Sequence, residues 1–323
     1  MKQFSLTTIG ALAFAACTAA FAQAYPAKPV RITSPYPTGI SPDISARLMA
    51  EKLSRYWGQP VIVEPRPGAN AFIAFGVVKK AAPDGYDLLL VGDSHLTINP
   101  HLFKSLPYDP ENDFAPIGLT YRAPFFIWIA SNSPYRTVQD LIADAKKDPN
   151  KVSYSTPYTG SPPHLGGAML AQMSGTNMLA VQFKEGPALY TSVANGDVTF
   201  TISTIGSATA MLKSGHLKGL AAASPQRSPD LPNLPTVQES GGPAGYEVDT
   251  WVGVVAPKGT PADVIGRLSA DINRAMAEPD VRERHKALGI QPVTSSPADM
   301  ANAIRTNLKK NADIVRRAGI QPE

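Results

Sequence analysis

Short apolar runs alternate with stretches of helical periodicity along almost the whole chain, which has 323 residues. The first run, Val30–Ser34, precedes a segment in which Ile44, Leu48 and Leu53 share one helical face. That segment ends at Gly58, a residue type common at helix C-termini. The alternation predicts an α/β fold in which helices flank mainly parallel sheets.

Two groups of such elements lie on either side of a proline-rich connection at residues 106–116. The first group has strands at residues 30–34, 59–64 and 87–92 and helices at 44–57 and 70–82. After a strand-like run at 117–120, the second group has strands at 125–130, 152–154, 178–184, 198–203 and 217–222, alternating with helices. Each group resembles half of a doubly wound domain.

The last part of the chain returns to the first group. Residues 251–256 indicate a strand, and the helices that begin near residues 260, 279 and 297 need a sheet to cover. We therefore expect lobe 1 to comprise residues 23–123 and 251–323 and lobe 2 residues 124–250, with the C-terminal helices packing across both lobes. Repeated crossing between lobes predicts a hinged cleft.

The first 22 residues have the pattern of a cleavable secretory signal peptide. Lys2 precedes a short apolar run, and Ala20-Phe21-Ala22 is a small-x-small cleavage site. Cys17, the one cysteine of the chain, would be removed with this segment, which excludes disulfides and thiolate chemistry from the mature protein. An alternative stays open, because residues 14–17 distantly resemble a lipoprotein cleavage box in which Cys17 is lipidated.

The net charge of +4 is scattered over basic and acidic residues and forms no nucleic-acid-binding stripe. His95 and His101 lack a metal-ligand spacing, and His216 and His285 have charged or polar neighbours typical of the surface. Catalytic signatures such as the Gly-x-Ser-x-Gly elbow and the phosphate-binding Gly-x-x-x-x-Gly-Lys loop are missing from the sequence. We expect neither an enzyme nor a cofactor or metal.

Two nearly identical turns stand between a strand and a helix, SPYPTGISP at residues 34–42 and STPYTGSP at residues 155–162. Gly39 and Gly160 permit backbone conformations that expose amides, and Thr38 and Thr159 add hydroxyl donors. Free N–H groups at the start of a helix attract anions. The two turns, which we call the first and second corner, predict an anion site between the lobes.

Several residues of the corners also have an ordinary structural explanation. Ser41 and Ser161 precede prolines and fit simple helix capping. Asp43, in the first turn of its helix, either stabilises free N–H groups or meets a polar or cationic part of a ligand. His164 holds the matching position and is either packed and hydrogen-bonded or part of the site. A catalytic set of Ser161, His164 and Asp43 is a further alternative.

Many segments resemble one family. They include YPAKPV at residues 25–30, the first corner with Asp43, EPRPGA at 64–69, AAPDGY at 81–86, INP at 98–100, LPYDP at 106–110, DFAP at 113–116, RSP at 227–229, LPTV at 234–237 and residues 251–257. In these segments the chain resembles the substrate-binding proteins of tripartite tricarboxylate transporters, also called the Bug family. The resemblance covers essentially the whole mature chain.

The resemblance implies a monomeric, two-lobed periplasmic binding protein that closes on a small carboxylate and delivers it to membrane permease subunits. Members hold the carboxylate with loop amides, hydroxyls and water from the two corners. The expected ligand-binding residues are Tyr36, Thr38, Gly39, Ile40, Ser41, Asp43, Asn70, Ser94, Tyr158, Thr159, Gly160, Ser161, His164, Phe183 and Ser203.

The chain departs from the family pattern at some of these positions. Ile40 and Tyr158 replace residues that are usually smaller, and Ser203 stands where many members have Asp. These changes favour a carboxylate with an apolar or aromatic body over an amino acid. Two other functions stay open: a ligand-loaded sensor for a receptor kinase, which needs the same cleft, and a secreted hydrolase that uses Ser161 and His164.

Overall fold

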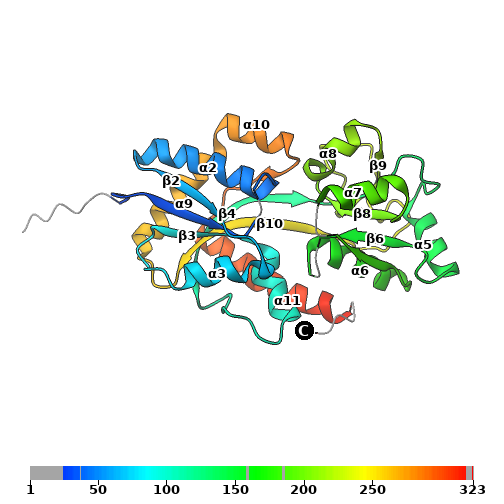
Figure 1. Ribbon diagram of the computed structural model, residues 1–323, viewed down its shortest axis with the longest axis horizontal. Helices are drawn as coiled ribbons and strands as arrows, with labels where there is room; N and C mark the ends of the chain where they lie inside the picture. The colour runs from blue at the N-terminus through cyan, green and yellow to red at the C-terminus, as the bar shows by residue number, and fades with distance from the viewer. Residues whose placement is uncertain (1–24, 37, 158–159, 184–185, 318–321, 323) are drawn as a thin grey trace, which may run out of the picture.

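The computed structural model describes residues 25–36, 38–157, 160–183, 186–317 and 322. The expected signal peptide, Cys17, Tyr158 and Thr159 lie outside these residues. Two sheets stand side by side along the long axis of the molecule, each covered by helices (Figure 1). In the described part of the chain, no helix is both long and apolar enough to cross a bilayer.

The sheet of the first lobe has six strands in the order β11-β4-β10-β3-β1-β2. They are β1 (Val30–Ser34), β2 (Val61–Pro65), β3 (Asp87–Gly92), β4 (Phe114–Pro124), β10 (Asp249–Pro257) and β11 (Gln291–Pro292). Apolar residues of α2 (Ser41–Trp57), α9 (Ala262–Ala277) and α10 (Pro279–Ala287) pack in one core cluster. The helices α3 (Phe72–Lys79) and α11 (Pro297–Arg317) contribute to a second cluster (Figure 1).

The sheet of the second lobe has five strands in the order β7-β6-β8-β5-β9. They are β5 (Phe126–Ala130), β6 (Ser153–Thr156), β7 (Leu179–Gln182), β8 (Phe200–Ser203) and β9 (Leu217–Ala222). The helices α5 (Val138–Lys147) and α6 (Pro162–Ser174) pack in one cluster, and α7 (Gly186–Asn195) and α8 (Ile205–Lys213) in another. Each lobe therefore buries apolar side chains in two clusters.

Both sheets are mixed, whereas the sequence predicted mainly parallel ones. The strands β1, β2 and β3 pair in parallel, and so do β6, β7 and β8. The strands β10 and β5 run antiparallel to their neighbours. Both enter their sheet from the other lobe, β5 one residue after β4 ends, so they run in the direction opposite to strands that end at the boundary.

The sequence also missed a helical segment after β3. It comprises the π-helix η2 (Ser94–Ile98) and α4 (Asn99–Leu102), and it is almost entirely buried. The helix expected at residues 70–82 is shorter, because η1 (Ala69–Ala71) has left-handed backbone at Asn70, with φ 48°. η1 comes after β2, and η2 with α4 comes after β3. Both segments therefore lie where these strands end at the lobe boundary, as the corners do.

His285 contradicts its prediction as a surface residue. Its side chain is fully buried, its Nε2 lies 2.9 Å from Ser45 Oγ, and its ring meets the edge of Tyr121. Burial lowers the pKa of His285 to about 4, so the imidazole is neutral at pH 7. The charged neighbours on α10 point elsewhere because a helix turns them onto a different face.

Candidate functional site

The first corner turns sharply at Gly39, whose φ of 86° lies in the left-handed region. Ile40 is extended and occupies the N-cap position of α2, so Ser41 is the first helical residue. No side chain caps α2 through the N-cap residue, which shows that capping does not explain Ser41. The Gly39 amide instead donates to Asp43 Oδ2 over 2.9 Å.

Asp43 is held from two sides. Its side chain is 1% exposed, and Arg47, one helical turn later, places Nε 3.1 Å from Oδ1 and 3.0 Å from Oδ2. Arg47 Nη2 lies 3.0 Å from Oδ1 as well. The carboxylate therefore fixes the Gly39 turn, as the structural interpretation of Asp43 predicted. Arg47 was not among the predicted residues, although its i,i+4 spacing from Asp43 was visible in the sequence.

The second corner repeats this geometry with other groups. Gly160 has φ 82°, and its amide donates to His164 Nδ1 over 3.2 Å. Because Nδ1 accepts this hydrogen bond, it carries no hydrogen of its own, and the neutral ring has its proton on Nε2. Burial lowers the pKa of His164, which favours this neutral form.

Ser161 caps α6, as predicted. Its Oγ accepts the backbone N–H of His164 at 3.3 Å and lies 2.8 Å from Thr156 Oγ1. The imidazole thus bonds a glycine amide, while the hydroxyl bonds the helix backbone and a neighbouring hydroxyl. This arrangement is that of a helix cap.

The other predicted residues surround the corners at different depths. Thr38, Gly39 and Ile40 are exposed. Ser94 is buried, and its backbone N–H donates a hydrogen bond to Asp93 Oδ1. Asn70 is exposed and accepts a hydrogen bond from Asn99 through its carbonyl.

Tyr36 lies inward from the first corner. Its ring centroid is 5.3 Å from that of His95, and a Cβ atom on Gly92 would lie 2.2 Å from the Tyr36 hydroxyl. His95 Nδ1 accepts the Gly92 amide at 3.1 Å, and burial lowers the pKa of His95 to about 4. Tyr36 therefore packs over the end of β3 and depends on a glycine there.

Ser203 belongs to a polar group at the end of β8. Ser203 Oγ donates to the Thr204 carbonyl at 3.4 Å, Thr204 Oγ1 lies 3.0 Å from Ser207 Oγ, and Trp128 Nε1 donates to the Ser203 carbonyl at 3.1 Å. Phe183 packs half-buried in the same apolar cluster as Tyr190. This wall of the second lobe combines hydroxyls with aromatic surface.

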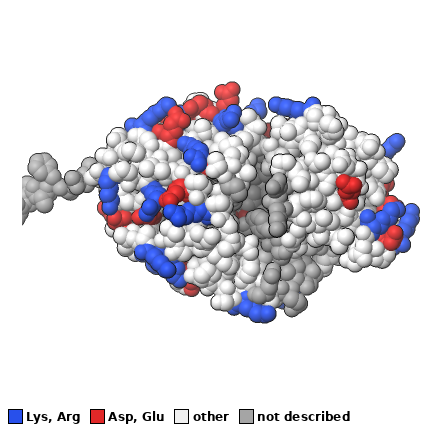
Figure 2. All heavy atoms as spheres, in the orientation of Figure 1, with Lys and Arg blue, Asp and Glu red and all other residues white. Residues whose placement is uncertain are grey.

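The corners lie where the two lobes meet. Gly160 is so close to α4 that a Cβ atom on it would lie 2.0 Å from Leu102 Cδ1. Ile98 and Leu102 of the first lobe form one buried cluster with Leu165 of α6 and Val315 of α11. Figure 2 shows the surface drawn inward between the lobes.

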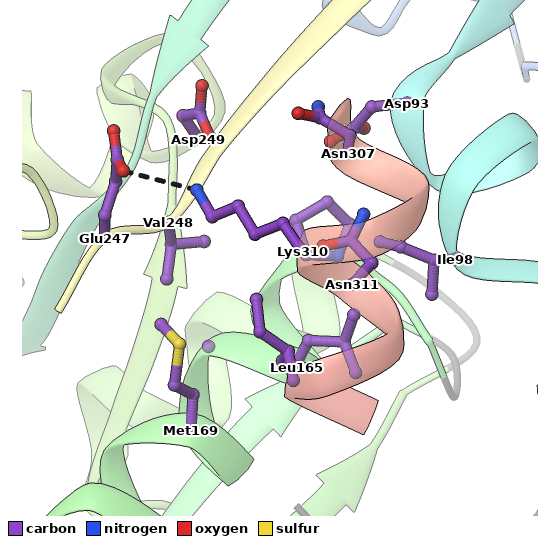
Figure 3. A pocket seen from close by; sticks show the side chains of 13 residues that line it. Asp93, Ile98, Leu165, Met169, Glu247, Val248, Asp249, Asn307, Lys310 and Asn311 are labelled. Atoms are coloured by element: carbon purple, nitrogen blue, oxygen red, sulfur yellow. Dashed lines mark hydrogen bonds and ion pairs between the residues drawn. The ribbon is translucent and has the colours of Figure 1, made fainter. Parts of the chain in front are cut away.

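A separate pocket lies between α6, α11 and the residues that lead into β10 (Figure 3). Lys310 crosses it to pair with Glu247, with 3.2 Å between Nζ and Oε2. Thr250 Oγ1 donates to Asp93 Oδ1 at 2.6 Å, and burial raises the pKa of Asp93 to about 7. No group of three or more potential metal ligands occurs among the residues that the structure describes.

The chain is similar to known proteins over most of its length. The sequence model described as "Tripartite tricarboxylate transporter family receptor" matches residues 45–320. The protein BugT of Bordetella pertussis is 32% identical over 300 residues, which cover 92% of this chain and 91% of BugT.

Two solved structures extend the likeness to the fold. "R. palustris Rpa4515 with adipate" has a TM-score of 0.85 at 29% identity and covers 93% of this chain and 100% of its own. MatC from Rhodopseudomonas palustris, with bound malate, has a TM-score of 0.80 at 26% identity and covers 90% of this chain and 100% of its own. The chain therefore belongs to the tripartite tricarboxylate transporter family receptors, which are periplasmic solute-binding proteins of the Bug type.

Proposed function

We propose that this protein captures a small carboxylate between its two corners and delivers it to the membrane subunits of a tripartite tricarboxylate-type transporter. The observation that carries the proposal is the pair of glycine turns at the carboxyl ends of β1 and β6, one in each lobe. Carboxyl ends of strands at the boundary of α/β units are the usual place for a ligand.

The glycine amides themselves are already bonded to Asp43 and His164, so the ligand needs other donors. We assign this role chiefly to the start of α2, where the N–H groups of Ser41 and Asp43 belong to the first turn of a 17-residue helix. First-turn amides have no acceptor inside the helix and carry its positive dipole end. The start of α6 offers fewer free N–H groups, because its first two residues are Pro162 and Pro163.

The body of the ligand is proposed to be apolar. Ile40 at the first corner is 42% exposed, and Phe183 adds aromatic surface on the opposite lobe. Adipate and malate, bound by the two similar proteins, are both dicarboxylates, and adipate has the longer apolar chain. A ligand with a carboxylate at one end and an apolar middle fits this combination.

A thermal-shift and calorimetric screen of the chain without residues 1–22 tests the proposal. The panel contains adipate, malate, benzoate, citrate and glutamate. Ligands that bind only the folded protein raise its melting temperature, so we expect a rise with adipate or benzoate and less with citrate or glutamate. Binding of glutamate alone would overturn the apolar-body proposal, and no shift with any carboxylate would overturn carboxylate capture.

Delivery to a transporter needs a second experiment. Cells that lack this protein should lose uptake of the carboxylate found in the screen, and expression of the full chain should restore it. A variant without an acceptor for the Gly39 amide, Asp43→Ala, should restore less uptake. Unchanged uptake in the deletion strain would favour the sensor alternative.

A further inference from the structure

A backbone contact joins the lobes far from the two corners in the sequence. Gly206, at the start of α8, lies so close to the end of α10 that a Cβ atom on it would be 2.0 Å from the Leu288 carbonyl oxygen. Gly289 lies equally close to the start of α8, because a Cβ atom on Gly289 would be 2.8 Å from Ile205 Cβ and 3.2 Å from Gly206 N. Each side presents a glycine to the other's backbone.

The two partners belong to different lobes. α8 follows β8 in the second lobe, whereas α10 packs in the first lobe's core through Val281. Figure 1 shows the end of α10 beside α8 at the top of the molecule, and α11 and α6 at the bottom. Gly160, packed against Leu102, makes a similarly close contact with the first lobe. The lobes thus meet at two places where the second lobe has glycine.

We propose that Gly206 is a positioning residue for lobe closure. Only glycine lets α8 approach the Leu288 backbone this closely, so residue 206 sets how fully the cleft shuts on its ligand. The proposal rests on the carboxylate-binding function proposed above. A ligand that contacts both lobes binds the closed form best, so a variant that disfavours closure loses affinity without losing any ligand contact.

Gly206 offers an unusually clean test of this idea. It has no left-handed backbone angle, unlike Gly289, whose φ is 63°. Alanine is therefore compatible with the local conformation of α8 and is a better helix former than glycine. A carbonyl oxygen of the backbone at 2.0 Å, however, cannot turn away as a flexible side chain would. The Gly206→Ala change should therefore act on closure and leave the helix intact.

The matched control is Gly266→Ala. Gly266 also lies inside a helix, α9, but a Cβ atom there meets nothing within 4 Å. We expect Gly206→Ala to raise the Kd for the best carboxylate of the screen at least tenfold, mainly through faster dissociation, since closure holds the ligand. Gly266→Ala should leave the Kd and both rate constants within twofold of the original chain. The melting temperature without ligand should fall in neither variant.

Small-angle scattering measures the radius of gyration, which a change confined to the surroundings of residue 206 would leave unaltered. With ligand bound, the radius of gyration of Gly206→Ala should exceed that of the original chain and of Gly266→Ala. If no carboxylate binds the original chain, carboxylate capture fails, and the same comparison without ligand still tests the closure contact. A Kd within twofold of the original, or equal radii of gyration for the three chains, would overturn the role of Gly206.

Discussion

The two corners share a backbone turn and differ in the group that fixes it. Gly39 and Gly160 have φ angles of 86° and 82°, and each amide donates to the side chain four residues later. In the first corner the acceptor is the carboxylate of Asp43, paired with Arg47. In the second corner it is the neutral imidazole of His164. One turn is held by a charged pair and the other by an uncharged ring.

This difference has two consequences for the site. Both glycine amides are engaged inside the protein, so the corners position the helix starts and a ligand must find its donors beyond the glycines. The second corner also depends on a group that ordinarily titrates near pH 6.5. The lobes should therefore respond differently to mutation and to acid, although their turns look alike.

Removal of the Asp43 carboxylate should have the largest effect. Asp43→Ala leaves the Gly39 amide without its acceptor and Arg47 without its partner, at a position that is 1% exposed. We expect the free energy of unfolding to fall by about 2–3 kcal/mol, as for other buried hydrogen bonds to charged groups. Urea denaturation of the original and variant chains measures this loss.

The second corner supplies the matched comparison. His164→Ala removes a neutral acceptor and should cost only about 1 kcal/mol. Asp43→Asn keeps an oxygen that accepts from Gly39 and should fall between the two alanine variants. Equal losses in Asp43→Ala and His164→Ala would contradict the distinction between a charged and an uncharged corner.

Acid should weaken the second corner through His164. Burial lowers the pKa of His164 below its unfolded value, so at intermediate pH the unfolded chain binds more protons and the stability falls as the pH falls. The loss begins near pH 6.5, the ordinary value for histidine, and grows as the pH falls toward the lowered pKa of the folded state.

His95 and His285 shift stability in the same direction, since burial lowers both pKa values to about 4. Asp93, whose pKa is raised to about 7, acts in the opposite direction. The test is therefore the difference in unfolding free energy between the original chain and His164→Asn from pH 8 to pH 5. It should shrink as the pH falls, and a constant difference would show that His164 does not titrate with folding.

Local patterns predicted much of this architecture. Three strands begin and end at the predicted residues, Val30–Ser34, Asp87–Gly92 and Leu217–Ala222, because apolar runs are bounded by polar or turn residues there. The corners were visible as repeated turn sequences, and their glycines do have positive φ. Such features depend on a few neighbouring residues, which is why one sequence was enough.

Features that depend on the arrangement of distant segments were not predictable. The crossings into β5 and β10 were predicted, but the antiparallel pairing of these two strands with their neighbours depends on distant segments, which no local periodicity records. His285 lies among charged residues of α10 yet faces Ser45 and Tyr121. The close approach of Gly206 to Leu288 likewise joins segments about 80 residues apart and leaves no trace in either one.

The serines of the corners should differ more than their sequences suggest. Ser161 caps α6 through its hydroxyl, whereas Ser41 is a helical residue behind the N-cap Ile40. Ser161→Ala should therefore cost about 1 kcal/mol of stability and Ser41→Ala no more than a few tenths. Thermal and urea unfolding of the two variants measure this, and a Ser41 loss as large as that of Ser161 would contradict the capping assignment.

The smallest expected effect concerns the strands that lead into the corners. Thr33 of β1 and Ser155 of β6 are fully buried, and neither hydroxyl has a hydrogen-bond partner among the described residues. An unpaired buried hydroxyl is unfavourable, so Thr33→Val, which keeps the shape, should stabilise the chain by roughly 0.5–1 kcal/mol. Ser155→Ala should be near neutral, because the lost hydroxyl leaves a small void. Unchanged stability with weaker carboxylate binding in either variant would instead show that the strand ends supply hydroxyls to the ligand.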